Sequence, residues 1–214
     1  MEFNYLKESL KDYIDRLSEK TPCPGGGSAS ILSVAIASSL VCMVANYTLG
    51  SKLVKEESQN IVKNILKDAA ELKETLSPLI EKDSYIYEKI RSVYKSVLKE
   101  SSYIQQYEER LKESIDLHFE ILNNCFIITE WNQLLVIHGN PNLISDVAVS
   151  SSLILGGIKA TKINILINLK EVRNREYVNN CVKKMEEIIL KTQEKAEEII
   201  EKIETKIKGD SDGR

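Results

Sequence analysis

The sequence has few of the residues that build metal sites, tight turns and basic surfaces. Its 214 residues include two His and four Cys, with no Cys-x-x-Cys spacing, so we expect no metal site. Four Pro and nine Gly are few for an all-β sandwich with its many turns. The 29 Lys and Arg are balanced by 32 Asp and Glu, which argues against a nucleic-acid-binding protein.

The sequence also has no secretory signal, since residues 1–20 are charged and amphipathic. We therefore expect a cytoplasmic protein with reduced thiols. The segment 29–45 carries no charge over 17 residues. That is short of the ~20 residues that span a membrane, and serines interrupt it. A buried core helix is the favoured interpretation, and we expect no membrane contact.

Apolar residues recur at helical spacing along most of the chain. This spacing predicts helices over residues 3–18, 28–50, 53–76, 102–137 and 174–207, with a further helix opening at Ser77-Pro78 as N-cap and first residue. In the first helix one face carries Phe3, Leu6, Leu10, Ile14 and Leu17. Segment 143–169 alternates like a strand near its end, but no second strand is available to pair with it, so we predict a helix there too.

The helix over 28–50 combines one stripe of large apolar residues with one of Ala and Ser. Small side chains allow neighbouring backbones to approach closely, so this helix is expected at the centre of the fold. With no repeat and no linker, the sequence predicts one all-α domain over residues 1–214. It is a multi-helix bundle with central small-residue-rich helices, and residues 210–214 form a frayed tail.

Two features could carry chemistry. The run Pro24, Gly25, Gly26, Gly27 and Ser28 precedes an apolar helix, whose free N–H groups attract anions; an ordinary turn is the alternative, and the P-loop spacing is absent. Counting 80, 83, 87, 90 puts Asp83 on a buried face, where its pKa would rise and suit it to proton transfer. The alternative is an Asp paired with Lys or capping another helix.

Other polar residues leave two interpretations open. Asp146 could pair with an amino-substituted ring or bond its own first turn, and Asn164 and Asn168 form either an interhelical pair or a pocket wall. Lys52 is a candidate for the site or a partner of a helix C-terminus. His118 and His138 are interpreted as packing or loop residues.

Four motifs in order, residues 21–28, 43–52, 140–147 and 164–169, resemble the cyclodeaminase/cyclohydrolase family. The resemblance implies an all-helical homodimer that acts on one-carbon tetrahydrofolates and needs no cofactor beyond that substrate. A cyclodeaminase closes N5-formimidoyltetrahydrofolate to 5,10-methenyltetrahydrofolate and releases ammonia. A cyclohydrolase interconverts the methenyl and 10-formyl forms. Of the two activities, the cyclodeaminase is preferred, and it could receive its substrate from a separate formimidoyltransferase. A non-catalytic scaffold of the same fold is a further alternative.

The resemblance also implies roles for individual residues. Asp83 would move protons, and Lys52 would hold the substrate's glutamate or orient the reacting carbon. The glycine turn would let the folate lie close to backbone. The remaining substrate-binding candidates are Asn140, Asp146, Asn164 and Asn168. The family often carries Pro near His118 and Arg near Leu166, and this sequence has neither.

Overall fold

The apolar spacing builds six α-helices and three single-turn 3-10 helices over residues 4–211, the part of the chain that this computed structural model describes. The α-helices are α1 (Leu10–Ser18), α2 (Gly26–Thr48), α3 (Glu56–Val97), α4 (Ile104–His138), α5 (Ile144–Leu169) and α6 (Arg175–Ser211). The 3-10 helices are η1 (Tyr5–Lys7), η2 (Ser101–Tyr103) and η3 (Pro141–Leu143). Within residues 4–211 there is no strand, so the all-α prediction is confirmed.

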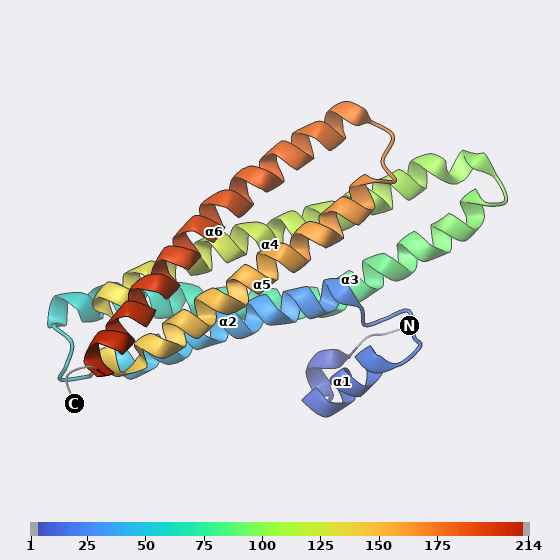
Figure 1. Ribbon diagram of the computed structural model, residues 1–214. Coiled ribbons are helices and arrows are strands. Elements are labelled where there is room, and N and C mark those ends of the chain that lie inside the picture. The colour runs from blue at the N-terminus through green and yellow to red at the C-terminus, as the bar shows by residue number, and fades with distance from the viewer. Residues whose placement is uncertain (1–3, 212–214) are drawn as a thin grey trace.

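Helix α2 packs against α3, α4 and α5 and keeps one side on the surface, so the expectation that it is central is only partly met: α4 is the helix that packs against α2, α3, α5 and α6, and α6 covers α4 and α5 (Figure 1). The small residues of α2 allow the close contacts that the sequence predicted. The hydroxyl of Ser38 donates to the carbonyl of Ala69 on α3, and the hydroxyl of Ser150 on α5 donates to the carbonyl of Ala37. The buried apolar side chains form one connected core.

One predicted helix boundary is wrong. Residues 53–76 and the helix expected to open at Ser77-Pro78 form a single 42-residue helix, α3, with Pro78 inside it. The Ser77 hydroxyl donates to the Lys73 carbonyl of the same helix, 2.9 Å away, so it does not cap a new one. Pro78 is exposed, and packing of both halves of α3 against α2 and α4 outweighs the local preference of proline.

The face of the first helix is also corrected. Leu6, Leu10, Ile14 and Leu17 are exposed, and Phe3 lies outside the described residues. The segment instead docks through Tyr5 and Tyr13, whose hydroxyls bond Ser84 on α3 and Ser28 on α2. Buried tyrosines need such hydroxyl partners, so the aromatic face, and not the aliphatic one, lies against the bundle.

The helix predicted over 3–18 is divided into η1 and α1, since Ser9 caps a new helix that starts at Leu10. The other boundaries differ by a few residues. Helix α2 begins at Gly26 rather than Ser28, and α6 continues through Gly209 to Ser211. The end of the predicted frayed tail, 212–214, lies outside the described residues. Segment 144–169 is helical throughout, as predicted against its strand-like alternation.

Two segments are long and apolar enough to cross a membrane by length and composition alone: α2, and residues 141–169. Core helices of soluble proteins satisfy the same criterion. In α2 just over half of the apolar window is buried inside the bundle, whereas in the segment containing α5 only a third is. The outer side of α5 is therefore an uncovered apolar surface.

Substitution of Pro78 tests the continuity of α3. Pro78→Ala restores the missing backbone N–H in an exposed helix interior, so we expect a gain of about 1–3 kcal/mol in the free energy of unfolding, measured by urea denaturation. Ser77→Ala is the matched control and should change stability by less than ~0.5 kcal/mol, because its hydroxyl bonds only within the helix. A helix start at residue 77 would give the reverse pattern, with a loss of ~1 kcal/mol at Ser77.

Candidate active site

A pocket of about 570 Å³ opens where the start of α2, the second half of α3, the start of α4 and the end of α5 meet. Its volume is in the range of small-molecule sites. The residues around it are Pro22, Cys23, Gly25, Gly26, Gly27, Asp83, Tyr87, Ile90, Arg91, Tyr94, Tyr107, Leu111, Ser114, His118, Asn164, Ile167, Asn168 and Glu171. Six of the candidates from the sequence, at positions 25, 26, 27, 83, 164 and 168, therefore come together.

Asp83 lies over the first turn of α2. Its side chain sits so close to Gly27 that a Cβ on that residue would collide with the carboxyl group. The backbone N–H of Ser28 donates a hydrogen bond to it. The group that occupies the start of α2 is therefore the protein's own carboxyl group, and Gly27 is required for its close approach.

Burial decides the charge state of Asp83. Asp83 is only 9% exposed, and this desolvation raises its pKa, against the lowering effects of His118 and of the Ser28 N–H. Loss of water is thus stronger than the helix start and the neighbouring imidazole together. The sequence predicted this direction from the position of Asp83 in an apolar stripe.

His118 on α4 is one of the pocket residues that the sequence interpretation missed, together with Arg91 and the tyrosines at positions 87, 94 and 107. Its Nε2 lies 3.6 Å from Oδ1 of Asp83, its Nδ1 lies 2.8 Å from the carbonyl oxygen of Ser114, and the residue is 1% exposed. Burial lowers the pKa of His118. The signal was present, because His118 interrupts an apolar face as Asp83 does. His138, by contrast, bonds the Ser58 hydroxyl at the far end of α4.

Asn164 and Asn168 fit both interpretations left open by the sequence. Asn164 donates to the Ser30 hydroxyl on α2, and Asn168 donates to the Ser114 hydroxyl on α4. These bonds fix α5 against its neighbours while the same amides line the pocket. Their carbonyl oxygens remain on the side chains as acceptors for a ligand.

The outer part of the pocket is aromatic. Tyr94 on α3 and Tyr107 on α4 meet with ring centroids 5.5 Å apart, and Tyr87 lies about two turns before Tyr94 on α3. Arg91 is half exposed at the same wall, 3.5 Å from Glu88. Flat rings beside a guanidinium suit a flat aromatic ligand with an anionic end.

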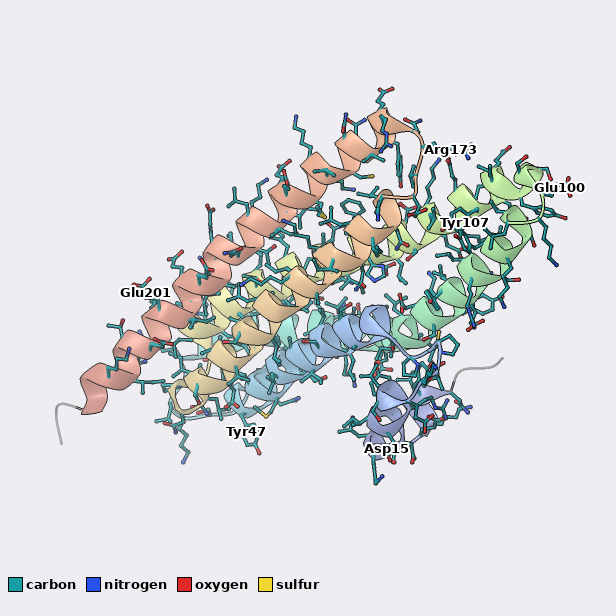
Figure 2. The ribbon with its side chains drawn as sticks, turned by 45° about the vertical axis from the view of Figure 1, so that its right-hand side comes forward. Asp15, Tyr47, Glu100, Tyr107, Arg173 and Glu201 are labelled. Atoms are coloured by element: carbon teal, nitrogen blue, oxygen red, sulfur yellow. The ribbon has the colours of Figure 1, made fainter. Side chains whose placement is uncertain are left out.

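Three candidates do not lie in this pocket. Lys52 is exposed in the loop after α2, and Asn140 and Asp146 flank η3 at that same end of the bundle. The 23 residues of α2 span roughly 33 Å between the two ends. In Figure 2, Tyr47 near the end of α2 lies far from Tyr107 of the pocket. The expectation that one protomer brings all candidates to one cleft is therefore wrong.

Asn140 has bonds that explain its place in the fold. Its backbone N–H donates to the Thr48 hydroxyl, and its side-chain amide donates to the carbonyl of Tyr47. Its side-chain oxygen accepts from the N–H of Asn142. Asn140 thus ties the α4–α5 turn to the end of α2.

Pro24 and Ser28 are buried behind the glycine turn rather than along the pocket. The Ser28 hydroxyl bonds Tyr13, and the Cys23 thiol on the pocket side donates to the carbonyl of Ser84, 3.6 Å away. Among residues 4–211, no group of three His, Cys, Asp or Glu side chains is arranged to hold a metal ion.

Comparison with known proteins assigns the family. Residues 9–187 match the profile of the family described as formiminotransferase-cyclodeaminase. The chain belongs to the formiminotransferase-cyclodeaminase family. Family membership agrees with the four motifs in the sequence, of which two, residues 21–28 and 164–169, contribute to the pocket and two, residues 43–52 and 140–147, lie at the other end of the bundle.

Relatives and a solved structure cover nearly the whole domain. The chain is 26% identical to a methenyltetrahydrofolate cyclohydrolase of Methylorubrum extorquens over 94% of its length and 98% of that protein's. It is 27% identical to a formimidoyltransferase-cyclodeaminase of Dictyostelium discoideum, of which it spans 36%. The crystal structure of formiminotetrahydrofolate cyclodeaminase from Thermotoga maritima matches with a TM-score of 0.81 at 27% identity, over 96% of this chain and 98% of that one.

The contact between Gly27 and Asp83 can be tested by stability. Gly27→Ala would force the buried carboxyl group away from the Ser28 N–H, so we expect a loss of about 1–3 kcal/mol in the free energy of unfolding. The matched control is Gly26→Ala, where the added methyl meets its nearest neighbour at an ordinary 3.8 Å. Equal stability of the two variants in urea titrations would show that Asp83 does not need this close approach.

Proposed function

We propose that this protein is a formimidoyltetrahydrofolate cyclodeaminase, which closes N5-formimidoyltetrahydrofolate to 5,10-methenyltetrahydrofolate and releases ammonia. The observation that carries the proposal is Asp83. It is a buried carboxyl group of raised pKa that borders a ligand-sized pocket, in a chain whose family and structural relative carry this activity in their names.

The reaction needs a group that moves protons. N10 of the folate attacks the carbon of the protonated formimidoyl group, and the C=N electron pair moves onto its nitrogen. The carbon becomes tetrahedral and is bonded to N5, N10 and a neutral amino group. The N10 proton leaves, the amino nitrogen gains a proton, and the C–N bond breaks with its electron pair going to ammonia. A carboxyl group with a raised pKa can take the first proton and give the second near neutral pH.

The walls of the pocket support a reduced folate as substrate. The amides of Asn164 and Asn168 offer hydrogen-bonding groups to a pterin ring, and the tyrosines at positions 87, 94 and 107 offer flat surfaces to the aminobenzoyl ring. Arg91 lies on the outer wall, where it could meet a glutamate carboxylate. We place the reacting carbon between these two parts, next to Asp83.

The alternative function is methenyltetrahydrofolate cyclohydrolase. It is favoured by the relative from Methylorubrum extorquens, which carries that name and matches this chain over 98% of its own length. Asp83 would transfer protons in this reaction too, because a hydroxyl group from water takes the place of the amino group on the tetrahedral carbon. For the cyclodeaminase, we propose a cytoplasmic enzyme that receives its substrate from a separate formimidoyltransferase.

An assay with both folates tests these functions. We expect the purified protein to form methenyltetrahydrofolate, followed by its absorbance, with release of ammonia from the formimidoyl substrate. Asp83→Asn should lower kcat/KM by about 10²–10⁴-fold, while the exposed Asp68→Asn on the same helix should not change it. If neither folate turns over and tetrahydrofolate gives no thermal shift, the non-catalytic scaffold is the better description.

We also propose that two copies pair through the outer sides of α2 and α5, here called the α2–α5 face. Its residues are Ile36, Leu40, Met43 and Tyr47 of α2, and Val149, Leu153, Gly156, Ala160, Ile163 and Ile167 of α5. None is charged, and the spacing of three and four is that of a helix–helix seam. Several are strongly exposed, with Ile163 at 63% and Tyr47 at 65%, so a second copy is a suitable cover.

Such pairing could bring Lys52, Asn140 and Asp146 of one copy close to the pocket of the other. Ile167 belongs both to the α2–α5 face and to the pocket. If the two-fold axis runs perpendicular to the helices, the two α2 helices are antiparallel. The loop with Lys52 of one copy then approaches the glycine turn of the other. We propose that Lys52 acts on the substrate of the second copy.

Mixed dimers test this pairing. Asp83→Asn and Lys52→Gln are each expected to inactivate the enzyme when made alone, and light scattering should show a dimer. Co-expressed, half of the dimers combine the two variants, and one of the two sites in each is intact, so about a quarter of wild-type activity should return. No recovery would place Lys52 and Asp83 in separate functions or within one subunit.

A further inference from the structure

We propose that Asp83 and His118 share one proton in the empty pocket, and that His118 thereby sets the protonation state in which Asp83 meets the substrate. His118 is a positioning residue in this proposal, since it acts through Asp83. The catalytic consequence rests on the proposed folate chemistry, whereas the shared proton is a property of the protein alone.

The hydrogen bond at Nδ1 determines where protons can be on the imidazole. The Ser114 carbonyl oxygen, 2.8 Å from Nδ1, can only accept, so Nδ1 carries a hydrogen and donates it. In the neutral ring Nε2 is then a bare acceptor. It lies 3.6 Å from Oδ1 of Asp83, just beyond hydrogen-bond distance, and has no hydrogen-bond partner among the described residues, so a small approach of the two side chains is enough to pair them. A carboxylate facing a bare Nε2 is unfavourable, whereas one proton between them satisfies both atoms.

The surroundings of Asp83 and His118 favour a single proton on the pair formed by the carboxyl group and Nε2. They disfavour both the loss of that proton and the gain of a second one. With one proton the pair is neutral in total, either as carboxylic acid and imidazole or as carboxylate and imidazolium. Loss of that proton leaves a net negative charge, and gain of a second leaves a net positive one. Both charged states are penalised by burial, which raises the pKa of Asp83 and lowers that of His118.

Neighbouring groups do not offset this preference. The only cation on the pocket wall is Arg91, which lies beside Glu88 and is half exposed, and Glu171 is exposed on the opposite side. Burial raises the pKa of three other groups near the pair, Tyr13 of α1, Cys23 of the glycine loop and Tyr107 of α4, and the pocket wall also carries Tyr87 and Tyr94 of α3. From α2 and α5 the pair meets only backbone N–H groups and amides.

A pair that holds one proton suits a reaction that moves a proton between two substrate nitrogens. The pair takes up the N10 proton and returns one to the amino nitrogen, whichever step comes first. It begins and ends each turnover with the same proton count. His118 lets Asp83 accept a proton without first losing its own to bulk water, because Nε2 provides the second place for it.

Nitrogen-15 NMR of histidine-labelled protein tests the shared proton without any substrate. The chain has only two His, so His138→Gln leaves His118 as the single signal. We expect a protonated Nδ1, and an Nε2 signal displaced from that of a bare nitrogen toward that of a protonated one. Asp83→Asn should return Nε2 to the bare position. An ordinary His titration near pH 6.5 that Asp83→Asn does not alter, or a proton fixed on Nε2, would overturn the proposal.

The pH profile of kcat/KM tests the consequence for catalysis. The wild type should lose activity on the acidic side, when the pair gains a second proton, and on the basic side, when it loses the last one. In His118→Gln the acidic limb should disappear, since no second proton site is left. The basic limb should move to lower pH, since Asp83 alone holds the last proton less tightly.

Controls separate this inference from a structural role and from the proposed function. His138→Gln should leave the profile unchanged, and a uniform loss of activity at every pH in His118→Gln would mean that the ring only fills space. If His118→Gln does not fold, the pH profile is measured on His118→Asn instead. The NMR comparison of the wild type with Asp83→Asn does not depend on either variant. If NMR shows the shared proton but the protein turns over neither folate, the proposed function is refuted and the shared proton between Asp83 and His118 is still supported.

Discussion

The structure depends on one close contact, that of the Asp83 carboxyl group with the first turn of α2. The contact exists because residue 27 is glycine and leaves room for the carboxyl group beside the backbone. Two opposing effects act on Asp83 there. The Ser28 N–H and the start of the helix favour the carboxylate, while burial favours the acid and is the stronger effect. A carboxyl group balanced in this way can exchange a proton at moderate cost, which an exposed or ion-paired Asp would not do.

The other elements hold this contact in place. Helix α3 runs unbroken through Pro78 and delivers Asp83 in register with the start of α2. Tyr13 of α1 bonds the Ser28 hydroxyl, and Tyr5 of η1 bonds Ser84 next to Asp83, so the N-terminal segment fastens the residues on either side of the contact. Helix α4 adds the imidazole, and the two asparagines of α5 fasten the remaining wall. Residues from η1, α1, α3, α4 and α5 thus all meet around the first turn of α2.

Helical periodicity was sufficient to predict most of this fold, because an apolar stripe reports which residues are buried. It also singled out Asp83, since a carboxylate in such a stripe conflicts with its surroundings. Periodicity does not report what a buried face packs against. Ser77-Pro78 therefore resembled a helix start, the aliphatic face of α1 was preferred over its tyrosines, and His118 was interpreted as packing. In each case the deciding partner is distant in sequence: α2 and α4 for Pro78, Ser84 and Ser28 for the tyrosines, and Asp83 for His118.

The same limit applies to the motif residues that lie away from the pocket. Four motifs identify the family, yet the length of α2 separates Lys52 and Asp146 from Asp83 within one protomer. The hydrogen bonds of Asn140 to the end of α2 give this residue a structural role, which is sufficient to explain its place in the motif. Lys52 is exposed, so folding does not account for it in the same way. The uncharged, exposed side of α2 and α5 connects the two ends of the molecule and reaches the pocket at Ile167. Under the proposed pairing of two copies, the motif near Lys52 would be half of a site that a second copy completes, and dimerisation would then be a requirement of catalysis rather than an addition to it.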